Sequence, residues 1–288
     1  MKRLLILAVA LMMMVACGAS RDVQHSEPLK IGINDVVRVD GPNLVEPHGE
    51  RLFIRGTNLG NWINPEGYMF GFSKTNSASN INLMLSQLVG PDFAAEFWRA
   101  FKDNYITEKD IDFIVSTGAN TIRVPFHYKL FTDEDYMGLT SEQDGFERID
   151  QLVEWCRGKG VYLILDMHDA PGGQTGDNID DSHGYPWLFE SEASQKLYCD
   201  IWKRIAQHYK NEPVILGYDL LNEPIAPYFE NQAEIDAKLA GVYKKGVDAI
   251  IVQDLGLAKL LIDNFPDLPL HASTQMSVHN LEGVKKLE

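Results

Sequence analysis

The sequence predicts an α/β fold of the (β/α)8 TIM-barrel type, present as about the first four β/α units followed by a β/α tail of different character. Short apolar strands alternate with amphipathic helices, which is the pattern of a parallel α/β fold. The segment 161–168 is almost continuously apolar, as expected for a strand covered on both faces. Polar residues collect where the strands end, and the chemistry of a barrel lies at that face.

The elements follow in order along the chain. After the first strand, residues 61–98 are rich in Asn, Ser, Gly and aromatics, which favours a long functional loop. The next helix starts with Thr107 as a capping residue and ends at Gly118. The predicted strands are 52–60, 121–126, 161–168 and 214–221, the helices 107–117, 149–160 and 194–209, and the tail has strands 247–253 and 270–274 around a helix at 257–265.

The composition and net charge exclude some classes of binding partner. The 288 residues carry 26 Lys and Arg against 41 Asp and Glu, a net charge of −15, which argues against nucleic acid as a partner. Cys156 and Cys199 lie in helical patterns with no metal-ligand spacing, so we expect buried thiols, with one disulfide left open. No metal or organic cofactor is expected.

The N-terminus has the layout of an export signal. Lys2 and Arg3 precede a short apolar run that ends at Cys17. Residues 14–17 resemble a bacterial lipobox, which implies lipidation of Cys17, membrane attachment and a cell-envelope location; a plain signal peptide for secretion is the alternative. The predicted organisation is a signal at 1–17, a tether at 18–43, the barrel part at 44–242 and the tail at 243–288.

One tripeptide occurs twice and flanks the strand 214–221. Asn211-Glu212-Pro213 precedes the strand, and Asn222-Glu223-Pro224 follows it. Because barrel chemistry lies at the C-terminal ends of strands, Glu223 is a catalytic candidate and Glu212 is expected to join elements on the far side. A carboxyl group at this position can protonate the leaving oxygen of a glycosidic bond.

Four ordered motifs resemble glycoside hydrolase family 5, the cellulase family, over about residues 44–240. They are Gly56 to Trp62, Ile122 to Pro125, Leu165 to His168 and Gly217 to Pro224. The resemblance implies a retaining barrel enzyme that hydrolyses a β-linked polysaccharide such as β-glucan or cellulose, with Arg123, His168 and Asn222 at the substrate and Glu223 as acid/base. The stretch from His168 to Gln174 looks like members that act on β-glucans.

Other polar and aromatic residues have weaker assignments. Trp62 and Trp187 are candidate sugar platforms, with a core or surface role equally open. Arg123 in a structural ion pair and His168 as a core histidine are the corresponding alternatives for those two residues. We expect His127 and His183 to be ordinary loop residues, and Glu66, Glu190 and Glu230 to be solvated charges.

The tail departs from this family. Residues 246–256 and 265–276 resemble the collagenase-like peptidase family, which predicts a junction of two unrelated sequences near Tyr243 to Gly246; a divergent barrel is the alternative. The family nucleophile, expected on a seventh strand, has no matching motif in this chain, so we expect little or no hydrolysis. Two other functions stay open: a non-catalytic carbohydrate-binding relic, and a peptidase fragment with an accidental N-terminus.

Overall fold

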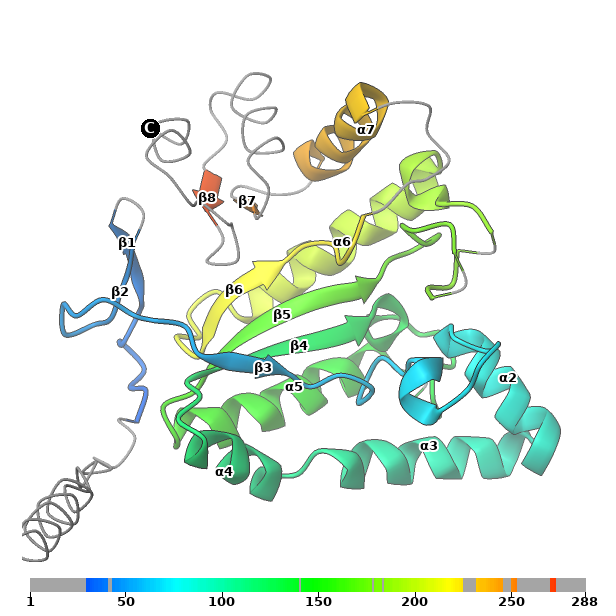
Figure 1. Cartoon of the computed structure of the whole chain (residues 1–288), viewed down its shortest axis with the longest axis horizontal. Coiled ribbons are helices and arrows are strands. Elements are labelled where there is room, and N and C mark those ends of the chain that lie inside the picture. Colours follow the sequence, from blue (N-terminus) through cyan, green and yellow to red (C-terminus); the bar gives the residue numbers. More distant parts are fainter. Residues whose placement is uncertain are drawn as a thin grey trace, which may run out of the picture.

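The computed structural model describes residues 30–40, 43–139, 141–177, 179–182, 184–224, 232–245, 250–252 and 270–272. Its centre is a parallel sheet of four strands in the order β3-β4-β5-β6, each hydrogen-bonded to the strand that follows it in sequence (Figure 1). This order and direction are those of a partial barrel and confirm the predicted α/β class. The strands are β3 Gly56–Asn58, β4 Thr121–His127, β5 Tyr162–Asp169 and β6 Ile215–Asp219.

Helices connect these strands as the sequence predicts. The N-terminus of α4 has a capping box, in which the N–H of Thr107 donates to Asp110 Oδ2 over 2.7 Å. Gly118 then turns the chain with a φ of 86°. Helix α5 begins earlier than predicted because Ser141 caps it, accepting from the N–H of Gln143. The helices are α4 Glu108–Ser116, α5 Glu142–Arg157 and α6 Glu192–His208.

The segment 61–98 is not the continuous loop that its composition predicts. It contains a short 3-10 helix, η1 Gly67–Phe70, the helix α2 Ala78–Val89 and the start of α3 Pro91–Tyr105 (Figure 1). Ser77 caps α2, and Gly90 separates the two helices. Trp98 fixes the pair, since its side chain is fully buried and its indole N–H donates to Asn82 Oδ1 over 2.8 Å. Side-chain burial therefore orders a segment whose composition is typical of loops.

The first barrel strand is shorter than predicted. Only Gly56–Asn58 pair with β4, while the preceding residues meet the side chain of Asn120. Asn120 Oδ1 accepts from the N–H of Arg55 over 2.8 Å, and its Nδ2 donates to the carbonyl of Phe53 over 2.9 Å. The Asn120 side chain thus satisfies backbone groups of Phe53 and Arg55, while the carbonyl of Arg55 accepts from the N–H groups of Asn120 and Thr121.

Trp62 lies in the core. Its side chain is 0% exposed, and its Nε1–H donates to the carbonyl of Lys102 over 2.8 Å. This is the core role that the sequence left open, so Trp62 leaves the set of candidate sugar platforms. Cys156 and Cys199 are both buried free thiols, which matches the expectation and leaves no disulfide between them.

The ends of the described chain carry small elements. A hairpin, β1 Arg38–Asp40 and β2 Asn43–Val45, falls partly in the predicted tether. Helix α7 Gln232–Lys244 lies at the end of the predicted barrel part, and the tail contributes two parallel strands, β7 Ile250–Val252 and β8 Leu270–Ala272. The predicted signal, Cys17 and the helix at 257–265 lie outside the described residues. Within the described part, no helix is long and apolar enough to cross a membrane.

Candidate active site

The candidate site is a cavity of about 460 Å³ at the C-terminal ends of the central strands. A second cavity of about 310 Å³ surrounds the N-terminal ends of β4 and β5, the face that is structural in barrels. The first cavity draws residues from all four strand ends and from the loops that follow them. Its polar lining consists of Asn58, Glu66, Asn76, Arg123, His168, Asp169, Gln174, Thr175, Asp180, Asn222 and Glu223.

Arg123 holds two carboxylates at the floor of this cavity. Asp166 and Asp219 stand opposite each other in the register of β5 and β6, so their charges would repel without a cation between them. One guanidinium nitrogen, Nη2, lies 3.0 Å from Asp166 Oδ2 and 2.8 Å from Asp219 Oδ2. The same nitrogen donates to Asn222 Oδ1 over 2.9 Å. Arg123 therefore forms an ion pair and also lines the cavity. The two alternatives for this residue, a structural ion pair and a place at the substrate, are not exclusive.

His168 extends the network from β5. Its Nδ1 lies 2.7 Å from Asp166 Oδ2, and its Nε2 lies 3.3 Å from Asn222 Nδ2 and 3.9 Å from Glu66 Oε1. Burial raises the pKa of Asp166 to about 6, although His168 and Arg123 both act to lower it. Burial also acts to lower the pKa of His168, but the hydrogen bond and charge of Asp166 outweigh it and raise that pKa above 6.5. The pair thus favours an imidazolium at the cavity.

Replacing Asp166 with Asn should lower the pKa of His168. The substitution removes the carboxylate that raises this pKa most, and leaves burial and the Arg123 charge, which lower it, against the charge of Glu66, which raises it. Proton NMR titration of the His168 ring measures the shift. The Asp150→Asn variant is the matched control, because Asp150 pairs with the exposed His208 instead. A His168 titration that does not move in Asp166→Asn would contradict this account of the pair.

Glu223 follows β6 and lines the cavity with an exposed side chain. Its backbone has a φ of 40°, which lies in the left-handed region that L-residues rarely adopt. The preceding Asn222 is anchored to β5, because its N–H donates to the carbonyl of Met167 over 3.1 Å. The first copy of the tripeptide lies at the other end of β6, where Glu212 Oε1 accepts from the N–H of Val214 over 3.0 Å and Oε2 pairs with Arg157. Glu212 therefore joins elements on the far side, as predicted.

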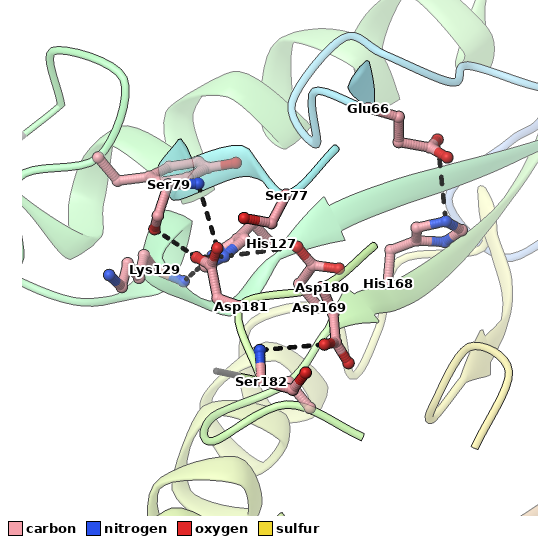
Figure 2. Close-up of polar contacts among 12 residues, drawn as sticks. Glu66, Ser77, Ser79, His127, Lys129, His168, Asp169, Asp180, Asp181 and Ser182 are labelled. Carbon is pink, nitrogen blue, oxygen red and sulfur yellow. Dashed lines mark hydrogen bonds and ion pairs between the residues drawn. The ribbon is translucent and has the colours of Figure 1, made fainter. Parts of the chain in front are cut away.

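Glu66 is a cavity residue, and the prediction of a solvated charge for it was wrong. It lies just before η1, and its N–H donates to Asn61 Oδ1 over 2.9 Å. Burial raises its pKa despite the nearby His168, and the charge of Glu223 adds to that rise. Glu66 and Glu223 are thus two carboxyl groups of one cavity (Figure 2 shows Glu66 facing His168). No motif indicates Glu66, because this residue lies within the segment 61–98, which the sequence pattern predicts only as a loop.

The prediction of an ordinary loop residue is wrong for His127, while the prediction of a sugar platform at Trp187 stays open. His127 ends β4, is fully buried, and its Nε2 lies 2.9 Å from Asp181 Oδ2. Trp187 begins a short 3-10 helix, is 50% exposed, and contacts Tyr185 at a ring-centroid distance of 4.8 Å. It is absent from the cavity lining, so its role as a sugar platform stays a prediction. His183 and Glu230 lie outside the described residues.

Comparison with known proteins places this site in a family. The model for cellulase (glycosyl hydrolase family 5) matches residues 76–254, which is more than half of the chain. The chain belongs to glycosyl hydrolase family 5. A β-xylosidase of Phanerodontia chrysosporium is 34% identical over 193 residues, covering 67% of this chain and 40% of that protein. Endoglucanase C of Acetivibrio thermocellus is 39% identical over 125 residues, covering 43% of this chain and 35% of that protein.

Solved structures support the fold of this family 5 chain. The crystal structure of AoRut superposes with a TM-score of 0.55 at 19% identity, covering 78% of this chain and 62% of that one. The rutinosidase from Aspergillus niger gives a TM-score of 0.54 at 16% identity, covering 77% and 63%. The chain therefore spans less than two thirds of these proteins and less than half of the two relatives named above.

A second family model matches the C-terminal part of this family 5 chain. Peptidase family U32 matches residues 221–288, so the two matched ranges overlap between 221 and 254. The presence of two families along one chain agrees with the expected chimera. The position of the junction, near Tyr243 to Gly246, falls inside the overlap and stays a prediction.

Proposed function

We propose that this site belongs to a retaining hydrolase of β-linked polysaccharides, with Glu223 as its acid/base. Glu223 protonates the leaving oxygen and then, as a carboxylate, takes a proton from the incoming water. The second carboxyl group of the retaining reaction attacks the anomeric carbon; in the family this nucleophile comes from a later strand, and this chain supplies no matching motif for it. Arg123, His168 and Asn222 bind and orient the sugar beside Glu223.

One observation carries this proposal: the polar network at the strand ends is preorganised next to Glu223. Arg123 and His168 both contact Asp166, and both also contact Asn222, the neighbour of Glu223. The cavity volume of about 460 Å³ suits a small number of sugar units. Arg123, His168 and Asn222 present N–H groups that donate hydrogen bonds to sugar hydroxyls. Glu66 presents carboxyl oxygens that accept hydrogen bonds from sugar hydroxyls.

Calorimetric titration of the purified chain with tetrasaccharides tests the proposal. We expect binding of at least one of the β-1,4-gluco, β-1,3-gluco, β-1,4-xylo and β-1,4-manno series. The Asn222→Ala variant should bind that sugar about tenfold more weakly, since a hydrogen bond to a polar ligand is worth roughly 1 kcal/mol or more. Glu190→Gln is the control, because Glu190 pairs with Lys238 outside the cavity. An absence of binding for all four series would contradict the proposal.

A second candidate is a carbohydrate-binding protein without turnover. The U32 match over the tail favours it, because a foreign tail leaves the family 5 part without its later strands. The same titration accompanied by an assay with α-glucosyl fluoride and an oligosaccharide acceptor separates the two candidates, because that reaction needs Glu223 but no nucleophile. Binding without formation of a β-linked product supports the second candidate. Cleavage of a peptide substrate would instead support the remaining alternative, a peptidase fragment.

We also propose that the chain is exported and anchored through a lipidated Cys17. The charged Lys2 and Arg3, the apolar run and the small residue before Cys17 support this reading of the sequence. Metabolic labelling with a radioactive fatty acid in a bacterial host tests it. Label in the wild-type chain and none in Cys17→Ser is the expected result, and equal labelling of both would contradict it.

A further inference from the structure

The backbone of Glu223 needs support from its surroundings. Its φ of 40° is unfavourable for a residue with a Cβ, because the Cβ crowds the neighbouring backbone in this region. Among the described residues other than glycine, only Asn61, Met137 and Glu223 have a positive φ. Such conformations persist where neighbouring groups fix the adjoining peptide planes. The peptide group between Asn222 and Glu223 is therefore the place to look for this support.

Gln174 binds that peptide group. Its Nε2 donates to the carbonyl of Asn222 over 3.0 Å and to the carbonyl of His168 over 2.6 Å. One amide thus ties the end of β5 to the end of β6, and both of its hydrogens are used. The carbonyl of Asn222 belongs to the peptide plane that precedes the φ rotation of Glu223, so this bond restrains the direction in which the Glu223 side chain leaves the backbone.

Gln174 is itself held from three sides. Its side chain is 1% exposed. Its Oε1 accepts from the N–H of Ala170 over 3.1 Å, and its own N–H donates to Asp180 Oδ2 over 2.8 Å. Asp180 also accepts from the N–H groups of Thr175 and Ser182, over 2.8 and 3.0 Å. These bonds define the β5 loop, residues 170–177 and 179–182, as a segment closed around Asp180.

Asp181 fastens the β5 loop to the rest of the protein. Its oxygens accept from the N–H and hydroxyl of Ser79 over 3.1 and 2.5 Å, at the start of α2. His127 Nε2 lies 2.9 Å from Asp181 Oδ2 (Figure 2). Since His127 Nδ1 accepts from the N–H of Lys129 over 3.1 Å, the ring proton sits on Nε2, which donates to Asp181. The two adjacent aspartates thus have different roles. Asp180 accepts hydrogen bonds from within the β5 loop, and Asp181 bonds the loop to Ser79 and His127.

We propose that Gln174 is a positioning residue that holds Glu223 in its left-handed conformation, and that Asp180 and Asp181 fix Gln174 for this task. The inference rests on the proposed function of Glu223 as acid/base. It goes beyond that function by assigning a task to the β5 loop. The chain of contacts runs from Ser79 and His127 to Asp181, through the adjacent Asp180 to Gln174, and from there to the Asn222–Glu223 peptide group.

The Gln174→Glu variant tests this directly. It keeps the Oε atom that accepts from Ala170 but loses both amide hydrogens. The amide and Cβ NMR resonances of Glu223, assigned by comparison with Glu223→Gln, report its backbone conformation. We expect these resonances to shift in Gln174→Glu and the affinity for the bound tetrasaccharide to fall about tenfold, since two buried hydrogen bonds are lost. Gln195→Glu is the matched control, a buried glutamine on α6 that faces Lys245.

A second variant guards against a misfolded loop. Asp181→Asn acts at the anchor, outside the cavity lining, and should shift the Glu223 resonances in the same direction by a smaller amount. A lowered melting temperature in either variant with unchanged Glu223 resonances would overturn the proposal and leave the loop a purely structural role. If the wild-type chain binds no sugar, the proposed function fails, but the Glu223 resonances still decide whether Gln174 positions that residue.

Discussion

The purified chain should hydrolyse gluco-oligosaccharides at least about a thousandfold more slowly than a family 5 enzyme that has both catalytic carboxylates, because removing one member of a catalytic set costs this much or more. Retention requires a nucleophile about 5 Å from the acid/base, on the opposite side of the anomeric carbon. Residues 225–288 carry carboxylates such as Asp254 and Glu282, but none stands in a family 5 motif.

Reducing-end release from cellotetraose and laminaritetraose measures this rate, with endoglucanase C as the reference enzyme. Glu66 is a carboxyl group of the described cavity whose pKa is raised by burial and by the charge of Glu223, so Glu66→Gln is the informative variant. We expect the small residual rate to be the same in wild type and Glu66→Gln. A rate close to that of the reference enzyme would refute the account of a missing nucleophile.

Loss of Arg123 should have the largest effect on stability. The Arg123→Met variant removes the cation that the buried Asp166 shares with its register partner Asp219, and leaves His168, 2.7 Å from Asp166 Oδ2, as the remaining partner of Asp166. Breaking a buried ion pair from one side is strongly destabilising, so we expect a loss of about 3 kcal/mol in the free energy of unfolding at neutral pH. Urea denaturation of both proteins measures it. Lys196→Met, which removes an exposed pair with Asp200, is the control and should change little.

The loss of stability in the Arg123→Met variant should increase as pH rises. The folded-state pKa of Asp166, about 6, is above its ordinary value of 3.8, so the folded chain binds the extra proton in this window and loses stability as pH rises through it. Arg123 lowers this pKa, and its removal extends the window upward. The difference between wild type and Arg123→Met should therefore be small at pH 4 and grow towards pH 8. A difference that is constant with pH would show that Asp166 is not its source.

The strand ends could be predicted because their chemistry follows the backbone pattern. Strand β5 was marked by its apolar run, and β6 by the Asn-Glu-Pro motif that follows it. Asp166 could have been added, since it lies two residues before His168 and therefore on the same face of the strand. Asp219 lies three residues before Asn222, so this alternation does not predict it. The register between β5 and β6 places Asp166 and Asp219 opposite each other. This register cannot be read from the sequence of either strand alone.

Loop residues were harder to predict, for a physical reason. Glu66, Gln174 and His127 take their roles from contacts with residues 48 to 102 positions away. The Asn- and Ser-rich segment 61–98 reads as a loop, but part of it forms helices that pack through the buried Trp98. Trp62 shows the converse, because an aromatic residue inside a motif proved to be core.

Fluoride release from α-glucosyl fluoride with an oligosaccharide acceptor measures whether Glu223 acts as the acid/base. Fluoride leaves from the face that a nucleophile would occupy, the acceptor hydroxyl attacks the anomeric carbon from the opposite face, and the Glu223 carboxylate takes the hydroxyl proton, so the products are a β-linked oligosaccharide and hydrogen fluoride. No nucleophile is needed. We predict β-linked product from the wild-type chain and none from Glu223→Gln. Fluoride release at the spontaneous rate in the wild type, or equal release in both proteins, would contradict the assignment of Glu223.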